Sequence, residues 1–88
     1  MAASQIDSET QELCELIEYV ASRLVDHPDE VEIVGDRRGQ MVRVQVNVHD
    51  DDMGRIIGRE GRIARAMRTL LMIAASRRGL RSSLDIGS

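Results

Sequence analysis

Four valines alternate with polar residues in the middle of the chain, and this pattern constrains the fold more than any other feature. Val42, Val44, Val46 and Val48 follow a period of two over seven residues, separated by Arg43, Gln45 and Asn47. Such a period is typical of a β-strand with one apolar face and one solvated face. The pattern therefore predicts a sheet that has the hydrophobic core on one side and solvent on the other.

The residues before this strand predict a helix and a hairpin. Ser8 and Gln11 form a capping box that opens the helix, and Pro28 lies beyond its end. A short β-branched run over residues 31–34, followed by turn residues at 35–39, predicts a hairpin with a loop of about five residues. The apolar residues that recur at helical spacing are Leu13, Leu16, Ile17, Val20, Ala21 and Leu24.

The residues after the strand predict two helices and a closing strand. Asp51 or Asp52 is expected to cap a short helix over residues 53–57. A long amphipathic helix is expected over roughly residues 61–78, with Gly79 at its C′ position, and residues 80–86 alternate as a last strand. The predicted order is α-β-β-α-α-β, an α+β fold in which a three-stranded sheet packs against helices.

Size and composition limit the core. With 88 residues, 42% of them hydrophobic, the chain is expected to form one domain over residues 8–88, preceded by a disordered tail over residues 1–7. Tyr19 is the only aromatic residue, so the core must be aliphatic, and each large side chain that is fully buried contributes about 1.5–3 kcal/mol. A core this lean leaves a modest margin of stability, which self-association or a partner would increase.

The expected location follows from two further features. Cys14 is the only cysteine, so no disulfide can form within the chain, and its amphipathic helical context suits a buried thiol in a reducing compartment. No apolar run approaches the roughly 18 residues of a membrane span, and residues 1–10 lack the pattern of a secretory signal. We therefore expect a cytoplasmic protein with no membrane partner.

Charge is divided unequally along the chain. The net charge of −3 combines −9 in residues 1–52, from four Arg and thirteen acids, with +6 in residues 53–88, from eight Arg and two acids. All the basic residues are Arg, since the chain contains no Lys. For binding a nucleic acid, a local positive patch of this kind matters more than the total charge.

The segment over residues 54–63 carries the candidate site. Gly58 and Gly61 lack Cβ atoms, so the backbone can turn sharply there and a phosphate can approach closely. The N–H groups that open the following helix add partial positive charge, and Arg59 can bind a phosphate as a bidentate donor. The two isoleucines before the loop can offer apolar surface to unstacked bases. The candidate binding residues are therefore Gly58, Arg59, Glu60, Gly61, Arg55, Ile56, Ile57, Arg62 and Arg65.

Other phosphate motifs and catalytic sites find no support. A Walker A loop needs a Lys, and a G-x-G-x-x-G fingerprint fails because residue 56 is Ile. No nucleophile, base and orienting group can be assembled from one Cys, two His and scattered acids, so we expect no enzymatic activity and no catalytic residue. His27 is expected to be solvated, and His49 with its neighbouring Asp residues to be surface charge, so no metal and no cofactor are predicted.

The loop and its surroundings resemble a known family. The motif Ile-Gly-Arg-Glu-Gly-Arg-Ile between two helical patterns resembles the signature of KH domains, which clamp about four nucleotides of single strand with a GXXG loop. The element order resembles the type II, bacterial form of that fold, in which two of the three strands run parallel. In a chain of this length, the stretch GRIIGREGRIARAMRTLL is similar to the KhpA family of small single-KH-domain proteins, and the resemblance spans roughly residues 8–86.

This resemblance implies a non-catalytic protein that holds single-stranded RNA through the loop Gly58–Gly61, as a homodimer or with a larger KhpB-like KH protein. It implies the role of an RNA chaperone or post-transcriptional regulator linked to cell elongation and division. Glu60 departs from a phosphate clamp because an acid repels the RNA backbone. The residues leave a second possibility open, a dimerising adaptor whose partner supplies most of the RNA contacts. In that case the long helix is expected to pair through Ile63, Met67 and Leu71.

Overall fold

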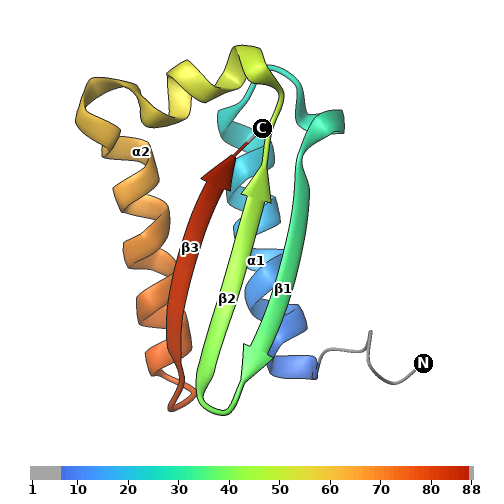
Figure 1. Ribbon diagram of the computed structural model, residues 1–88, viewed down its shortest axis with the longest axis vertical. Helices are drawn as coiled ribbons and strands as arrows, with labels where there is room; N and C mark the ends of the chain where they lie inside the picture. Colours follow the sequence, from blue (N-terminus) through green and yellow to red (C-terminus); the bar gives the residue numbers. More distant parts are fainter. Residues whose placement is uncertain (1–6, 88) are drawn as a thin grey trace.

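The computed structural model describes residues 7–87, apart from the side chain of Arg59. The first six residues of the predicted tail lie outside this range. In chain order the elements are α1 (Ser8–Leu24), the short 3-10 helix η2 (Pro28–Glu30), β1 (Glu32–Arg38), β2 (Met41–Asn47), α2 (Asp50–Ser76) and β3 (Arg81–Gly87) (Figure 1). The two helices predicted after the central strand are thus parts of one element, α2, which bends between them.

The valine-rich strand β2 lies at the centre of the sheet, whose order is β1-β2-β3. β1 pairs with it antiparallel, with Gly35 opposite Val44, and β3 pairs with it parallel, with Leu84 opposite Val44. A parallel pair needs a crossover connection, and α2 supplies it. The predicted α+β fold is confirmed, including the two parallel strands expected for the type II KH arrangement.

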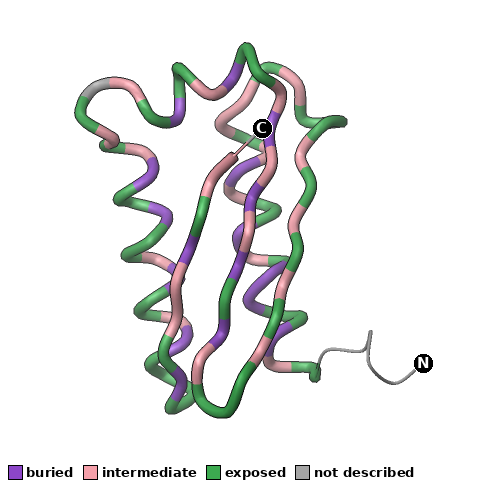
Figure 2. The backbone as a smooth tube through the Cα atoms, in the orientation of Figure 1, coloured by how far each residue is buried: buried purple, intermediate pink, exposed green. Residues whose placement is uncertain are grey.

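The core lies on one face of the sheet. All four alternating valines, residues 42–48, are buried, as their period predicts. In Figure 1, α1 lies behind the sheet and the later part of α2 runs alongside β3, and Figure 2 shows buried positions along the elements that face one another. With the valines, the core contains Leu13, Cys14, Ile17, Ala21, Ile56, Ala64, Met67, Leu71, Ala75, Leu80 and Leu84.

The start of α1 differs from the prediction. Asp7 is the N-cap, and its side chain accepts a 2.7 Å hydrogen bond from the backbone N–H of Thr10. Ser8 is already helical, and the Gln11 side chain donates forward to Glu15 at 2.9 Å. The predicted capping box between Ser8 and Gln11 is therefore wrong by one residue. An Asp is as good a cap as a Ser, and Asp7 gains a second contact at 2.7 Å from Arg37 on β1.

The hairpin is tighter than predicted. β1 continues through Arg38, which lies opposite Met41, so that only Gly39 and Gln40 form the turn. Gly39 has a φ of +60°, a conformation that glycine adopts without steric cost. The predicted five-residue loop is wrong because the strand pairing extends into the charged segment, where Asp36 lies opposite Arg43.

The end of α2 agrees with the prediction for Gly79. This glycine has a φ of +73°, and its N–H donates to the Ser76 carbonyl at 3.0 Å. The N–H of Leu80 donates to the Ala75 carbonyl at 2.9 Å, which completes the hydrogen-bond pair of a Schellman motif with the glycine at C′. This turn delivers the chain directly into β3.

Candidate functional site

The candidate loop lies at a corner of α2. Glu60 and Gly61 have φ angles of 64° and 69°, which a regular α-helix does not contain. The helix therefore consists of a first limb, residues 50–59, and a second limb, residues 62–76, which run in different directions in Figure 1. The predicted interruption between two helices is present as this corner.

The backbone of the corner explains one of the two loop glycines. A left-handed conformation costs a residue with a Cβ atom about 1–2 kcal/mol, so glycine is favoured at position 61. Glu60 adopts the same conformation in spite of its side chain. Its carbonyl oxygen accepts a hydrogen bond from Nη1 of Arg65, which holds the corner from the second limb.

The fold does not explain the other glycine. Gly58 is helical, and a Cβ atom added there would meet nothing within 4 Å. Glycine in a helix interior is less stable than alanine by roughly 0.5–1 kcal/mol, so this residue lowers the stability of the chain without relieving a contact. The same holds for Gly54 earlier in the first limb, so the open space by itself does not distinguish Gly58. What distinguishes Gly58 is its place two residues before the left-handed corner.

The arginines of the second limb take part in no ion pair of the described residues. Each arginine ion pair of the described residues uses an acid from residues 1–52; the arginines concerned are Arg37, Arg38, Arg55 and Arg78. The exposed arginines of the second limb, Arg62, Arg65 and Arg68, belong to none of these pairs. Arg68 donates instead to the Leu84 carbonyl of β3 at 3.1 Å, and Arg65 to Glu60. Among these three, Arg62 makes no such hydrogen bond within the described part of the chain.

The remaining predicted site residues differ in how far they are exposed. Ile57 is 46% exposed, whereas Ile56 is 0% exposed and belongs to the core. The expectation that both isoleucines offer surface to a ligand is therefore corrected, because one turn of a helix directs neighbouring side chains to different faces. Arg55 is exposed and pairs with Asp26 at 3.1 Å. The expectation for the Arg59 side chain lies outside the described residues.

The first limb begins differently from the prediction. The N-cap is His49, whose Nδ1 accepts a 3.0 Å hydrogen bond from the backbone N–H of Asp51. Neither expected cap occupies the N-cap position: Asp51 is exposed, and Asp52 is 1% exposed and points into the protein. The acids at the start of the helix still complement its dipole, as the sequence predicts.

Asp52 was expected as a helix cap, but its contacts with residues 26 and 27 were not predicted from the sequence. Its Oδ1 accepts from the Asp26 backbone N–H at 2.9 Å, and its Oδ2 from the backbone N–H and Nδ1 of His27, both at 3.1 Å. Burial alone would raise the pKa of Asp52, but the hydrogen bonds from Asp26 and His27 outweigh it and hold that pKa below its usual value. Three consecutive Asp residues were the available signal, but nothing local distinguishes the buried one.

The side chain of His27 is 38% exposed, so it is partly solvated as predicted, but it also makes specific contacts that were not predicted. Its ring stacks on that of His49, with centroids 4.1 Å apart and planes 16° from parallel. The hydrogen bond with Asp52 raises the pKa of His27, and partial burial opposes this rise. Since an ionised carboxylate only accepts, the ring carries its proton on Nδ1.

The two histidines and Asp51 are close enough to suggest a metal site, since their ligand atoms lie within 4.8 Å of one another. The ring geometry opposes that function. Nδ1 of each ring is already used in a hydrogen bond, and the in-plane lone pairs of two nearly parallel rings do not converge on one point. The cluster is arranged to fasten the start of α2.

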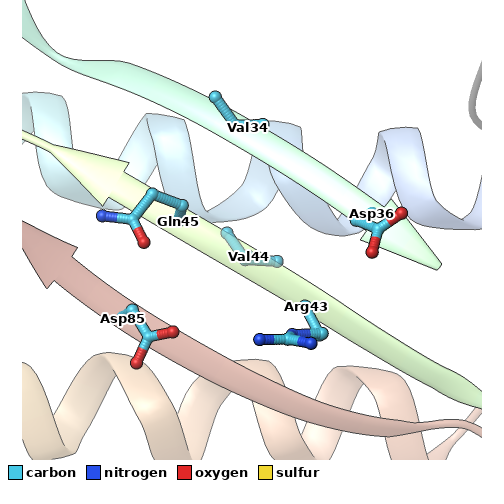
Figure 3. Close-up of a pocket in the computed structure, with 6 residues that line it drawn as sticks. All are labelled: Val34, Asp36, Arg43, Val44, Gln45 and Asp85. Atoms are coloured by element: carbon cyan, nitrogen blue, oxygen red, sulfur yellow. The ribbon is translucent and has the colours of Figure 1, made fainter. Parts of the chain in front are cut away.

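A shallow hollow of about 220 Å³ lies on the strands (Figure 3). It is lined by Val34, Asp36, Arg43, Val44, Gln45 and Asp85. None of these residues belongs to α2, and the charged ones are of both signs. The hollow therefore forms no part of the glycine corner.

Comparison with known proteins relates most of the folded region to one family. The family model of the KhpA/KhpB KH domain matches residues 14–86. A Halalkalibacterium halodurans protein named RNA-binding protein KhpA is 42% identical over 71 residues, which cover 81% of this chain and 93% of the relative. Proteins with the same name from Bacillus subtilis and Treponema pallidum are 36% and 43% identical, covering 86% and 82% of this chain and 89% and 90% of the relatives.

No solved structure matches the chain significantly. Among the described residues, none of the helices has both the length and the apolar character needed to cross a membrane. The family match includes β1, β2, all of α2 and nearly all of β3, and it contains the glycine corner. The chain therefore belongs to the KhpA/KhpB family of KH-domain proteins.

Proposed function

We propose that this protein binds single-stranded RNA, with the loop Gly58–Gly61 against the RNA backbone, and that it catalyses no reaction. The observation that carries the proposal is the glycine corner: Gly58, helical and with open space where a Cβ atom would be, lies two residues before the left-handed backbone of Glu60 and Gly61. The relatives named RNA-binding protein KhpA give this open surface its ligand class.

The chemistry of the corner fits a phosphate backbone. The backbone N–H groups that begin the second limb carry partial positive charge, and Arg62 adds a guanidinium without an acidic partner among the described residues. Ile57 offers exposed apolar surface beside the loop for an unstacked base. Contacts to the backbone position the RNA, and base contacts supply what discrimination there is.

The test is Gly58→Asp, which places a negative charge at a position where a Cβ atom meets nothing within 4 Å in the free protein. We expect the affinity for a labelled single-stranded RNA to fall by about tenfold or more, equivalent to roughly 1.4 kcal/mol. Gln40→Glu is the matched control, because it adds the same charge at the exposed hairpin turn, at the opposite end of the molecule (Figure 1). Unchanged RNA binding by folded Gly58→Asp would contradict the proposal.

We also propose that the protein pairs with a second copy of itself or with a larger KH protein. In this paired form it would act in RNA regulation. The face expected for this pairing is corrected: Met67 and Leu71 are each 1% exposed and belong to the core. An apolar stripe remains on the second limb at positions i, i+4 and i+7, formed by Ala66, Leu70 and Ile73, the last of which is 51% exposed.

Light scattering after size exclusion tests the stripe. We expect Ile73→Glu to shift the protein toward monomer, whereas Thr69→Glu, exposed on the same limb, leaves the mass unchanged. If the adaptor alternative holds, RNA binding by the wild-type chain alone is weak and increases when the partner is added. A wild-type monomer that binds RNA tightly by itself contradicts both pairing and the adaptor role.

A further inference from the structure

The start of α2 is fastened to the segment that follows α1. The carboxylate of Asp52 accepts three hydrogen bonds, from two backbone N–H groups and one imidazole, all within residues 26 and 27. Arg55, almost one turn further along, pairs with the side chain of Asp26 at 3.1 Å. Two side chains of the first limb therefore hold the same short segment.

This attachment lies close to the loop along the helix. Gly58 follows Asp52 by six residues, which corresponds to about 9 Å of helical rise. The corner at Glu60 and Gly61 separates the loop from the second limb, so the orientation of the first limb decides where the loop lies. A carboxylate that is 1% exposed and accepts three bonds fixes such an orientation firmly, because moving the limb away would leave a buried charge without its hydrogen-bond donors.

We propose that Asp52 is a positioning residue for the Gly58–Gly61 loop, and that protonation of His27 strengthens its hold, so that loop order and RNA affinity decrease as the pH rises. This inference rests on the proposed function, since it concerns how the same loop is presented to RNA. It adds a regulation of that loop by proton concentration, through a contact outside the RNA-binding surface.

The charges around His27 set the direction of the effect. Its pKa lies above the ordinary 6.5, chiefly because of the hydrogen bond with Asp52, while desolvation opposes the rise. The charges of Asp52 and Asp51 on α2 and of Glu30 on η2 act in the same direction as the hydrogen bond. The ring of His49 stacks on the His27 ring, and its Nδ1 accepts the cap bond from the Asp51 backbone N–H.

The Arg55–Asp26 ion pair adds one charge of each sign next to His27, which follows Asp26 in the chain. Below pH 6.5 His27 carries its proton in the folded and unfolded states, and its added attraction to Asp52 is fully present. That attraction is lost as the pH rises through the folded-state pKa, above 6.5.

Two substitutions separate the carboxylate from the proton. Asp52→Asn keeps the shape but offers only one acceptor oxygen to three donors, so at least one bond is lost. His27→Asn keeps an N–H donor near the position of Nδ1 but does not titrate. Asp50→Asn is the matched control, since it removes the same charge from an exposed position two residues away on the same helix.

The experiment measures two quantities at pH 6 and pH 8 for each full-length variant. The first is amide hydrogen-exchange protection of residues 53–61, corrected for the intrinsic rate at each pH and measured without RNA. The second is the affinity for a fluorescein-labelled single-stranded RNA at constant ionic strength. Because the first measurement needs no RNA, a failure of the positioning role is distinguishable from a failure of the RNA-binding proposal.

For the wild type and Asp50→Asn, we expect protection and affinity to be several-fold higher at pH 6 than at pH 8. His27→Asn should lose this pH dependence in both quantities, and Asp52→Asn should be several-fold weaker at both pH values. If Asp52→Asn does not fold, His27→Asn alone decides. Retention of the wild-type pH dependence by His27→Asn, or wild-type protection in folded Asp52→Asn, would overturn the inference.

Discussion

The guanidinium of Arg65 donates a hydrogen bond to the backbone carbonyl of Glu60, five residues earlier in the chain. This bond crosses the corner of α2 and supports the left-handed backbone of a residue that carries a side chain. Arg65 and Arg62 are one turn apart and both exposed, but only Arg65 is used to close the corner. The two arginines should therefore contribute to RNA binding in different ways.

Substitution of these arginines should separate a phosphate contact from a structural support. Arg62→Ala removes a cation that is available to a phosphate, and we expect the slope of log affinity against log salt concentration to decrease by about 0.7. Arg65→Ala should weaken binding through the loop itself, with faster amide exchange at residues 58–61. Equal salt slopes for Arg62→Ala and the wild type would exclude the phosphate contact.

Position 60 should limit both stability and affinity. Glu60→Gly relieves a left-handed conformation that costs a side-chain-bearing residue about 1–2 kcal/mol, although the greater freedom of unfolded glycine offsets part of this gain. It also removes an acid from the loop, so RNA affinity should rise. Glu60→Gln is the control that removes only the charge: we expect it to raise affinity without raising the denaturation midpoint. Weaker binding by both variants would show that the acid contributes favourably.

The two loop glycines should respond oppositely to alanine in denaturant unfolding. Gly61→Ala introduces a Cβ atom at a φ of 69°, and we expect a loss of about 1–2 kcal/mol. Gly58→Ala meets open space in a helix, and we expect a gain of roughly 0.5–1 kcal/mol. RNA binding should nevertheless weaken in Gly58→Ala, because the added methyl group stands on the surface that the backbone approaches. A destabilised Gly58→Ala would mean that the fold, not the ligand, requires this glycine.

The elements of the fold could be predicted because their signals are local. The valine alternation of β2 and the C′ glycine at position 79 depend on neighbouring residues only. The caps could not be predicted as securely: Asp7 and Ser8 are both good N-caps, and the choice of Asp7 is accompanied by an ion pair with Arg37, thirty residues away.

The candidate site likewise contains a part that local sequence predicts and a part that it does not. The glycine loop and its arginines could be recognised from sequence, since a motif and a charge excess identify them. The contact between Asp52 and His27 joins residues 25 positions apart, and no periodicity relates them. Ile56 is buried and Ile57 is exposed because of the rotation of the first limb about its axis. That rotation depends on the corner and on the cap at His49.

These two isoleucines allow a direct separation of core from binding surface. Ile56→Ala removes a side chain that is 0% exposed, and we expect a loss of about 2–5 kcal/mol in the free energy of unfolding, with RNA affinity retained in the fraction that stays folded. Ile57→Ala changes a side chain that is 46% exposed, so stability should change little while RNA affinity falls. Chemical denaturation and RNA titration of both variants, performed below the unfolding midpoint of Ile56→Ala, measure the two effects independently. If Ile57→Ala binds RNA as the wild type does, the bases lie elsewhere, and the first limb contributes only its backbone at Gly58.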